Sequence, residues 1–237
     1  GDLMFKTIRN AFKVKELKNK LLYTFMMLVV IRFGSALPIP GVRTDFFANW
    51  FAKQTTDVFG FFNAMTGGSF SQMSIFALSI TPYITSSIII QLLTIAIPKL
   101  EELQKDGEDG RKKIQEYTRY VTVGLALIES SAMAIGFGRQ GLLADYNAWN
   151  IIVAIVTMTT GSALLMWIGE QITDKGVGNG ISIVLLLNIL SSVPSDIRNL
   201  YFKFVFGQDI PMAALRLAIV VLVIVAMVVF VIVLNDA

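Results

Sequence analysis

Residues 73–97 read MSIFALSITPYITSSIIIQLLTIAI, and this stretch decides the fold class. It has no Asp, Glu, Lys or Arg, and about 20 consecutive apolar residues suffice to cross a bilayer. Pro82, near its middle, removes a backbone hydrogen bond that neighbouring helices or a water-filled cavity must replace at membrane depth. Ser, Thr, Tyr and Gln along the stretch suggest that one face meets something other than lipid. We interpret the segment as a membrane span that forms the wall of a passage.

The composition of the whole chain agrees with a membrane protein. Hydrophobic residues make up 54% and charged residues 16% of its 237 residues, whereas charged residues are about a quarter of a soluble domain. The apolar residues gather in blocks, which predicts an all-α, polytopic transmembrane helical bundle. The expected spans are 21–37, 73–97, 118–136, 148–168, 180–193 and 211–234. The fifth is short for an untilted crossing.

Cysteine and histidine are absent from the chain. Their absence excludes disulfides, thiolate metal sites, cysteine nucleophiles and every histidine-based acid–base scheme. The sequence therefore predicts no catalytic, cofactor-binding or metal-binding residue.

The first 20 residues are lysine-rich and amphipathic, which suits a cytoplasmic helix on an anionic membrane surface. A nucleic-acid-binding arm is less favoured, because the tract runs directly into an apolar span. A secretory signal sequence is also disfavoured, since Arg32 interrupts the apolar core and no small-x-small cleavage site follows.

The distribution of Lys and Arg predicts the orientation. The N-terminus, the loop 98–117 with its flank to Arg119, and the loop 169–179 hold thirteen of these residues, against five in the alternate connections. The positive-inside rule then places the N-terminus in the cytoplasm. The chain stops directly after the sixth expected span, which we interpret as a fragment of a longer polypeptide.

Residues 57–70 are apolar enough to enter a membrane but too short to cross one. Helical spacing of the apolar side chains, ended by Thr66 and two glycines, predicts a half-helix before the second span. Two interpretations remain open from the pattern alone: a mobile stopper in a pore, and an amphipathic helix on the outer surface.

Two apolar stripes could form a collar that excludes water and ions. Ile80 and Ile84 share one stripe of the second span, and Ile181 and Leu185 share one of the fifth. Ordinary packing is the alternative for both. Glu129, the one acidic residue well inside a span, is either an ion site or a polar contact between helices, and the latter is favoured.

Four strings carry a specific resemblance: SIFALSITPYITSSIIIQLL, DGEDGRKKIQEYTRY, LLMWIGEQITDKGVGNGISI and FFNAMTGGSF. In this order and with similar spacing, they resemble the bacterial SecY family of protein-translocation channels. The resemblance implies a ten-helix fold of two halves related by an inverted repeat. This chain would hold helices one to five and the sixth.

The resemblance also implies roles for named residues. The plug would contain Val58, Phe61, Phe62, Asn63, Met65, Gly67 and Gly68. The pore ring would include Ile80, Ile84, Ile181 and Leu185, of which the leucine departs from the isoleucine usual in the family. One side of a lateral gate would carry Thr85, Ser87, Ile128 and Glu129. Arg119 and Glu170 are candidates for contact with a partner subunit.

The function that the resemblance implies is passage of unfolded secretory polypeptides across the bacterial cytoplasmic membrane, and release of apolar helices into it. The implied partners are the small subunits SecE and SecG, the SecA motor or a ribosome, the signal sequence with its translocating polypeptide, and lipid. No cofactor and no direct nucleic-acid contact are implied. A secondary transporter of a small solute is the alternative, and an intramembrane enzyme a weaker one, because neither paired ionisable groups nor paired carboxylates occur at midplane.

Overall fold

The computed structural model describes residues 14–53, 57–204 and 210–236, and within these ranges the regular elements are helices. Extended pairing in the described ranges is confined to two isolated bridges, Pro38 with Ser74 and Val42 with Leu143. The chain divides into two compact units, 1–191 and 192–237. The expected N-terminal amphipathic tract 1–20 is described from residue 14 onward, where α2 begins at Lys15.

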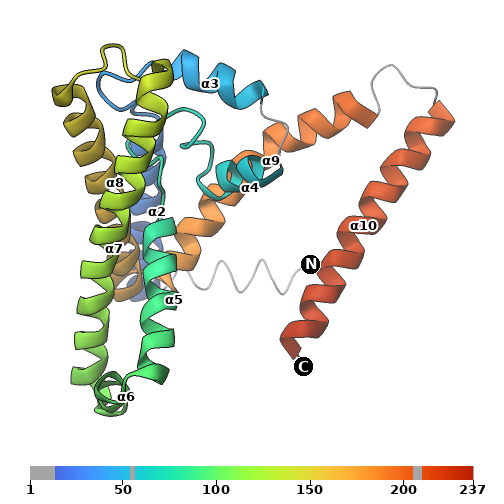
Figure 1. Cartoon of the computed structure of the whole chain (residues 1–237). Coiled ribbons are helices and arrows are strands. Elements are labelled where there is room, and N and C mark those ends of the chain that lie inside the picture. The colour runs from blue at the N-terminus through green and yellow to red at the C-terminus, as the bar shows by residue number, and fades with distance from the viewer. Residues whose placement is uncertain (1–13, 54–56, 205–209, 237) are drawn as a thin grey trace. The chain divides into compact units, whose positions relative to one another are not determined.

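Four helices form the body of the first unit: α2 (Lys15–Ser35), α5 (Thr81–Ala96), α7 (Gly107–Phe137) and α8 (Ala148–Lys175). The long helix α7 packs against both α5 and α8, and α2 packs against α8 (Figure 1). Hydroxyl pairs join these helices: Ser86 Oγ lies 2.5 Å from Thr122 Oγ1, and Ser130 Oγ lies 3.0 Å from Thr159 Oγ1. Small polar residues of this kind let apolar helices approach closely and hydrogen-bond inside a membrane.

The second expected span differs from the prediction, because only part of 73–97 is helical. The helix α5 starts at Thr81, with Pro82 in its first turn, where the missing N–H and fixed φ of proline are tolerated. The preceding residues form turns with left-handed backbone at Met73 (φ 47°) and Ser79 (φ 53°). This stretch pairs with the end of α2, since Ile75 N donates to Leu37 O over 2.9 Å. The apolar pattern showed burial, but not that backbone pairing and a proline start shorten the helix.

The expected loop 98–117 is helical in the structure. Its first part is α6 (Pro98–Lys105), bent by 103° from α5, and α7 begins at Gly107. A methyl group at Gly110 would lie only 1.8 Å from Leu103 O, so the two helices meet backbone to backbone. Within α6, Lys105 Nζ donates to Glu101 Oε1 over 2.6 Å, and this hydrogen bond lowers the pKa of Glu101.

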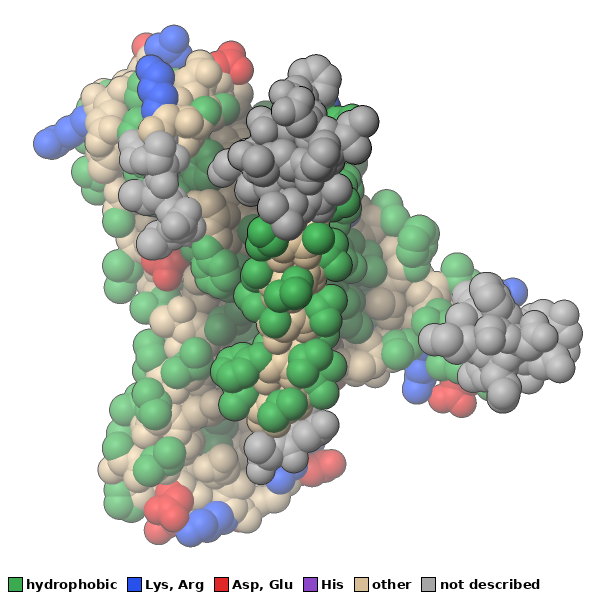
Figure 2. Space-filling model, turned by 90° about the vertical axis from the view of Figure 1, so that its right-hand side faces the viewer, with side chains coloured by type: hydrophobic (Ala, Val, Ile, Leu, Met, Phe, Trp, Pro, Cys, Tyr) green, Lys and Arg blue, Asp and Glu red, His purple; other side chains and the backbone are tan. Residues whose placement is uncertain are grey.

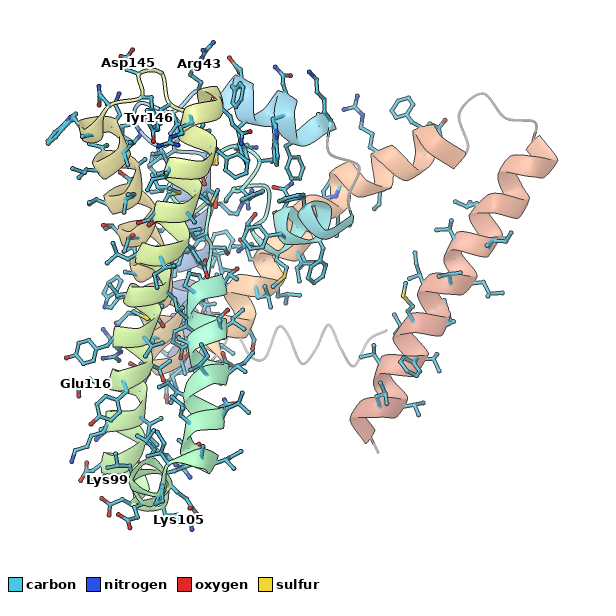
Figure 3. The ribbon with its side chains drawn as sticks, viewed as in Figure 1. Arg43, Lys99, Lys105, Glu116, Asp145 and Tyr146 are labelled. Carbon is cyan, nitrogen blue, oxygen red and sulfur yellow. The ribbon has the colours of Figure 1, made fainter. Side chains whose placement is uncertain are left out.

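Many of the charged residues lie at the two ends of the first unit. Figure 3 places Lys99, Lys105 and Glu116 toward one end of the helices, and Arg43 and Asp145 at the other. The expected 98–117 and 137–147 connections therefore occupy opposite ends, as alternating spans require.

At the end of the first unit that holds Arg43 and Asp145, α3 (Thr44–Lys53) packs against η1 (Gly138–Leu142), a wide helical turn after α7, and α4 (Asp57–Met65) follows α3 in the chain. The expected 169–179 connection ends at α9 (Gly180–Phe204), where Asn179 Oδ1 accepts from Ser182 N over 3.1 Å and caps the helix. The helix is longer than the expected span 180–193 and contains Pro194.

The second unit consists of the end of α9 and of α10 (Ile210–Asp236). Nearly every described side chain from Leu217 to Leu234 is apolar and exposed, and Figure 2 shows hydrophobic side chains along this helix. Such a helix, apolar on all sides, is typical of a membrane span.

Among the described residues, three helical segments are long and apolar enough to cross a membrane. They are Gly107–Leu142, Ala148–Lys175 and Leu217–Leu234, and the bent pair α5–α6 makes a fourth if it counts as one span. The spans expected at 21–37 and 180–193 lie within α2 and α9, and their crossing of the membrane stays a prediction.

Candidate functional site

The predicted plug begins with the short helix α4 and ends in a tight turn. Asn63 organises the turn: its Oδ1 accepts from Ser71 N over 2.9 Å, and its carbonyl accepts from Thr66 Oγ1 over 3.0 Å. Gly67 (φ 64°) and Gly68 (φ 83°) supply the left-handed backbone that the reversal requires. The side chain of Val58 lies outside the described residues.

Aromatic rings of the plug segment pack with rings of α3 and α7 in a cluster, which we call the aromatic seat. Phe70, 4% exposed, is its centre, with its ring centroid 4.9 Å from that of Phe62 and 5.2 Å from that of Phe47. Trp50 of α3 joins Phe59 of α4 to Phe137 of α7, with centroid separations of 5.6 Å and 4.8 Å. Edge-to-face pairs of this kind add about 0.5–1.5 kcal/mol each beyond the area they bury.

Not every predicted plug residue takes part in the seat. Phe61 is 69% exposed and points away from the aromatic cluster, whereas Met65 is half-buried at the end of α4. One face of α4 therefore packs on the aromatic seat, and the other face is exposed. This arrangement is consistent both with a movable stopper and with a surface helix.

Two side chains from other helices reach the plug turn at Gly67. The guanidinium of Arg32 donates from Nη1 to Gly67 O over 3.4 Å, and Ser191 Oγ donates to the same oxygen over 3.5 Å. A methyl group at Gly67 would lie 2.9 Å from each of these donor atoms and 3.1 Å from Asn188 Cα. The turn is thus packed closely against α2 and α9, but its hydrogen bonds to these helices are weak, since both donor–acceptor distances are near the long limit for a hydrogen bond.

Three of the four predicted ring residues come together in one apolar cluster. Ile80 is 1% exposed in a cluster of buried side chains, and Ile84 and Ile181 pack against it. Leu185 is half-buried and lies outside this cluster. The structure therefore joins α5 and α9 through isoleucines at the level where α5 begins.

The predicted gate residues are not the ones that form the hydrogen bonds between α5, α7 and α8. On α5 and α7 the interhelical bonds come from Ser86 and Ser130, next to Thr85 and Ser87 and to Glu129 in sequence. Ile128 is 67% exposed. Of the four gate positions, Ile128 is therefore on an exposed face of α7, whereas Thr85, Ser87 and Glu129 are half-buried.

Glu129 lines a cavity of about 420 Å³ whose other walls are mostly apolar. The cavity lies between the plug and α7, and its lining includes Phe59, Phe62, Met133 and Phe137. Glu129 is the one acidic residue of its predicted span. The structure places it beside the plug, in an otherwise mostly apolar cavity, rather than between packed helices.

Arg119 and Glu170 contact each other within the chain. Arg119 Nε donates to Glu170 Oε1 over 2.8 Å, and Gln115 Nε2 donates to the same oxygen over 3.1 Å. The Glu170 side chain is 8% exposed and that of Arg119 47%. The ion pair ties α7 to α8, so of the two only Arg119 leaves much surface for a partner subunit.

Sequence reasoning missed four polar contributors: Arg32, Ser79, Asn188 and Ser191. An arginine near the end of a span ordinarily extends toward the membrane surface, but Arg32 contacts the plug turn. The spacing of Asn188 and Ser191, one helical turn apart in an apolar segment, was a usable signal, because buried polar residues in a span need partners. Within the described ranges, no cluster of His, Cys, Asp or Glu could hold a metal ion.

Comparisons with known proteins agree on one family. A sequence profile of the SecY family matches residues 74–237. The protein translocase subunit SecY of Bacillus licheniformis is 40% identical over 99% of this chain and 55% of its own length. The subunit of the same name from Pseudomonas aeruginosa is 39% identical over 92% of this chain and 49% of its own length. The chain spans about half the length of these curated relatives.

Solved structures show the same fold. Sec61 in the canine ribosome–channel complex from the endoplasmic reticulum superposes with a TM-score of 0.53 at 19% identity, over 79% of this chain and 38% of the other. A structure described as that of a protein conducting channel gives the same values. Together with the apolar helices, these matches show a multi-pass membrane protein, and the chain belongs to the SecY family.

Proposed function

We propose that the complete protein conducts unfolded secretory polypeptides across the bacterial cytoplasmic membrane and releases apolar helices sideways into lipid. The observation that carries the proposal is the segment 57–84. In this segment, a short helix and a turn that is bonded only weakly to α2 and α9 precede Ile80 and Ile84, which cluster with Ile181 of α9. Family membership supports the proposal, since relatives bear the name protein translocase subunit.

The residues suggest how such a passage works. Branched aliphatic side chains such as Ile84 and Ile181 offer a sliding polypeptide no specific hydrogen bond, so passage tolerates any sequence. When empty, an apolar constriction resists ions because water leaves it. The plug adds a second barrier, and its weak bonds at Gly67 let it move. Gate residues such as Ile128, exposed on α7, would let an apolar signal helix pass to lipid, where its transfer is favourable.

The protein is proposed to act as one subunit of a larger assembly. The small subunits SecE and SecG would surround it, SecA or a ribosome would drive transport, and no active site of its own is required. The excess of Lys and Arg places the N-terminus and α6 in the cytoplasm in this arrangement.

Crosslinking in reconstituted vesicles tests the function. With photoreactive residues at Ile84 or Ile181, we expect capture of an unfolded secretory precursor during motor-driven transport. The matched control is Ile95 on α5, which is 81% exposed and predicted to face lipid. Solute uptake without precursor entry would instead favour a secondary transporter, and absence of precursor at both ring positions would reject the channel.

Polar substitution of the ring is expected to make the resting channel leak. Ile84→Ser removes an apolar side chain from the constriction without removing the fully buried Ile80 from the core. Wetting of the constriction should raise ion conductance in planar bilayers roughly tenfold. Ile88→Ser, one turn further along α5 at a position 52% exposed, is the matched control. Equal conductance in both variants would refute a ring role for Ile84.

A further inference from the structure

The residue before the predicted ring is held in an uncommon conformation by buried hydrogen bonds. Ser79 is 1% exposed and left-handed (φ 53°), which non-glycine residues seldom adopt. Asn188 Nδ2 of α9 donates to Ser79 Oγ over 3.0 Å, and Ser162 Oγ of α8 donates to Ser79 O over 3.1 Å. Because Ile80 follows Ser79 directly, these two hydrogen bonds fix the position of Ile80 and the start of α5.

Asn188 also faces the plug. Its Cα lies 3.1 Å from the position of a methyl group at Gly67, so the plug turn rests on the backbone of α9 at this residue. Ser191, one turn further along α9, donates to Gly67 O, and Arg32 donates to the same oxygen from α2. One turn of α9 therefore touches the plug on one side and the start of α5 on the other.

The side chain of Asn188 has no other hydrogen-bond partner that would explain its place. It is 2% exposed, and among the described residues its Oδ1 is a buried acceptor without a donor. A leucine, which branches at the same atom, would remove this unpaired oxygen but would also leave Ser79 Oγ without its donor. Among the described residues, the hydrogen bond of the Asn188 amide therefore goes to Ser79. Asn188 itself lies on the same stripe of α9 as Ile181 and Leu185.

We propose that Asn188 is a positioning residue that couples the seated plug to the pore ring. By holding Ser79 it keeps Ile80 in the resting geometry, and in that geometry α9 presents the surface on which Gly67 rests. Arg32 of α2 contacts the same turn. Movement of the plug and a change in ring diameter are then linked events. This inference rests on the proposed function of the plug and the ring.

The test combines two readouts in the complete protein in lipid. The first is resting ion conductance. The second is the rate at which cysteines placed at Gly67 and Ser191 form a disulfide, which reports a seated plug in a chain that has no cysteine of its own. For Asn188→Leu we expect conductance to rise and disulfide formation to slow, each by about fivefold, the factor associated with one hydrogen bond.

A second-site variant separates coupling from a general loss of fold. Ser79→Gly adopts a positive φ without strain and needs no donor, so Asn188→Leu with Ser79→Gly should return both readouts toward their original values. If Asn188→Leu fails to accumulate, Asn188→Ser, too short to reach Ser79, is measured in its place. Leu190→Ala, at a position 54% exposed on α9, is the control and should change neither readout.

Each outcome decides the matter. A rise in conductance without slower disulfide formation would overturn the coupling, and so would failure of Ser79→Gly to restore either readout. If the cysteine-free protein does not export a precursor, and the 67–191 cysteine pair with Asn188 intact forms no disulfide, the proposed function fails. If the cysteine-free protein exports and the cysteine pair forms its disulfide, while Asn188→Leu changes neither readout, only the coupling fails.

Discussion

A disulfide between cysteines at Gly67 and Ser191 is expected to stop precursor export, and a reductant should restore it. The Oγ atom of Ser191 lies 2.9 Å from the position of a Cβ atom at Gly67. In a disulfide, each Cβ atom lies about 3 Å from the sulfur of the partner cysteine, so a sulfur in place of this Oγ atom has a suitable separation. Because the bond ties the plug turn to α9, the plug cannot leave the passage. We expect the export rate to fall by roughly tenfold or more under oxidation.

The reduced double variant is the first control for this experiment. A cysteine at Gly67 must adopt φ 64°, which costs about 1–2 kcal/mol and weakens the seat even without a disulfide. The difference between oxidised and reduced protein cancels this strain. Cysteines at Ser130 and Thr159, whose hydroxyls lie 3.0 Å apart on α7 and α8, form a second control that leaves the plug free. Export that continues through a fully formed 67–191 disulfide would contradict the plug assignment.

Gly161→Ala is expected to destabilise the first unit strongly, because the added methyl group would meet backbone atoms. The added carbon would lie 1.9 Å from Ile75 O and 2.8 Å from Ile75 C. Both are backbone atoms of the stretch that leads to Ser79 and Ile80, so no flexible side chain can give way. Overpacking costs about 1–3 kcal/mol in ordinary cores, and we expect at least the upper end here.

Thermal unfolding in detergent measures this effect, with Gly124→Ala as the matched control. Gly124 lies in α7 with no atom within 4 Å of an added methyl group. Alanine there should be neutral, or stabilise the helix by up to about 1 kcal/mol. Equal unfolding temperatures for the two variants would show that α8 and the 73–80 stretch do not meet as closely as described.

The sequence predicted the fold class well, because apolar blocks of membrane length have few alternatives in an all-α chain. It failed at the boundary of α5 for a physical reason. Hydropathy reports burial, whereas the conformation of 73–80 depends on backbone pairing with the end of α2 and on left-handed Met73 and Ser79. Neither the pairing nor the positive φ leaves a trace in composition.

The structure brings some of the predicted ring residues together, and their role stays a prediction. Ile80 and Ile84 share a stripe because helical spacing is local, and the fold adds Ile181 from a helix 100 residues away in the chain. The aromatic seat could not be predicted, since Phe47, Phe70 and Phe137 come from three separate segments. The bond from Arg32 to Gly67 was missed for the same reason: 35 residues separate them, and a terminal arginine in a span usually reaches for lipid headgroups.

The hydroxyl pairs between helices have a mechanical consequence. Ser86 with Thr122 and Ser130 with Thr159 fasten α5, α7 and α8 at successive levels, and the Arg119–Glu170 ion pair adds a third fastening. An assembly fastened in this way moves as a rigid body, since sliding of one helix would break several buried bonds together. Any sideways opening would therefore occur between this three-helix block and its neighbours, and the block would move as one rigid body.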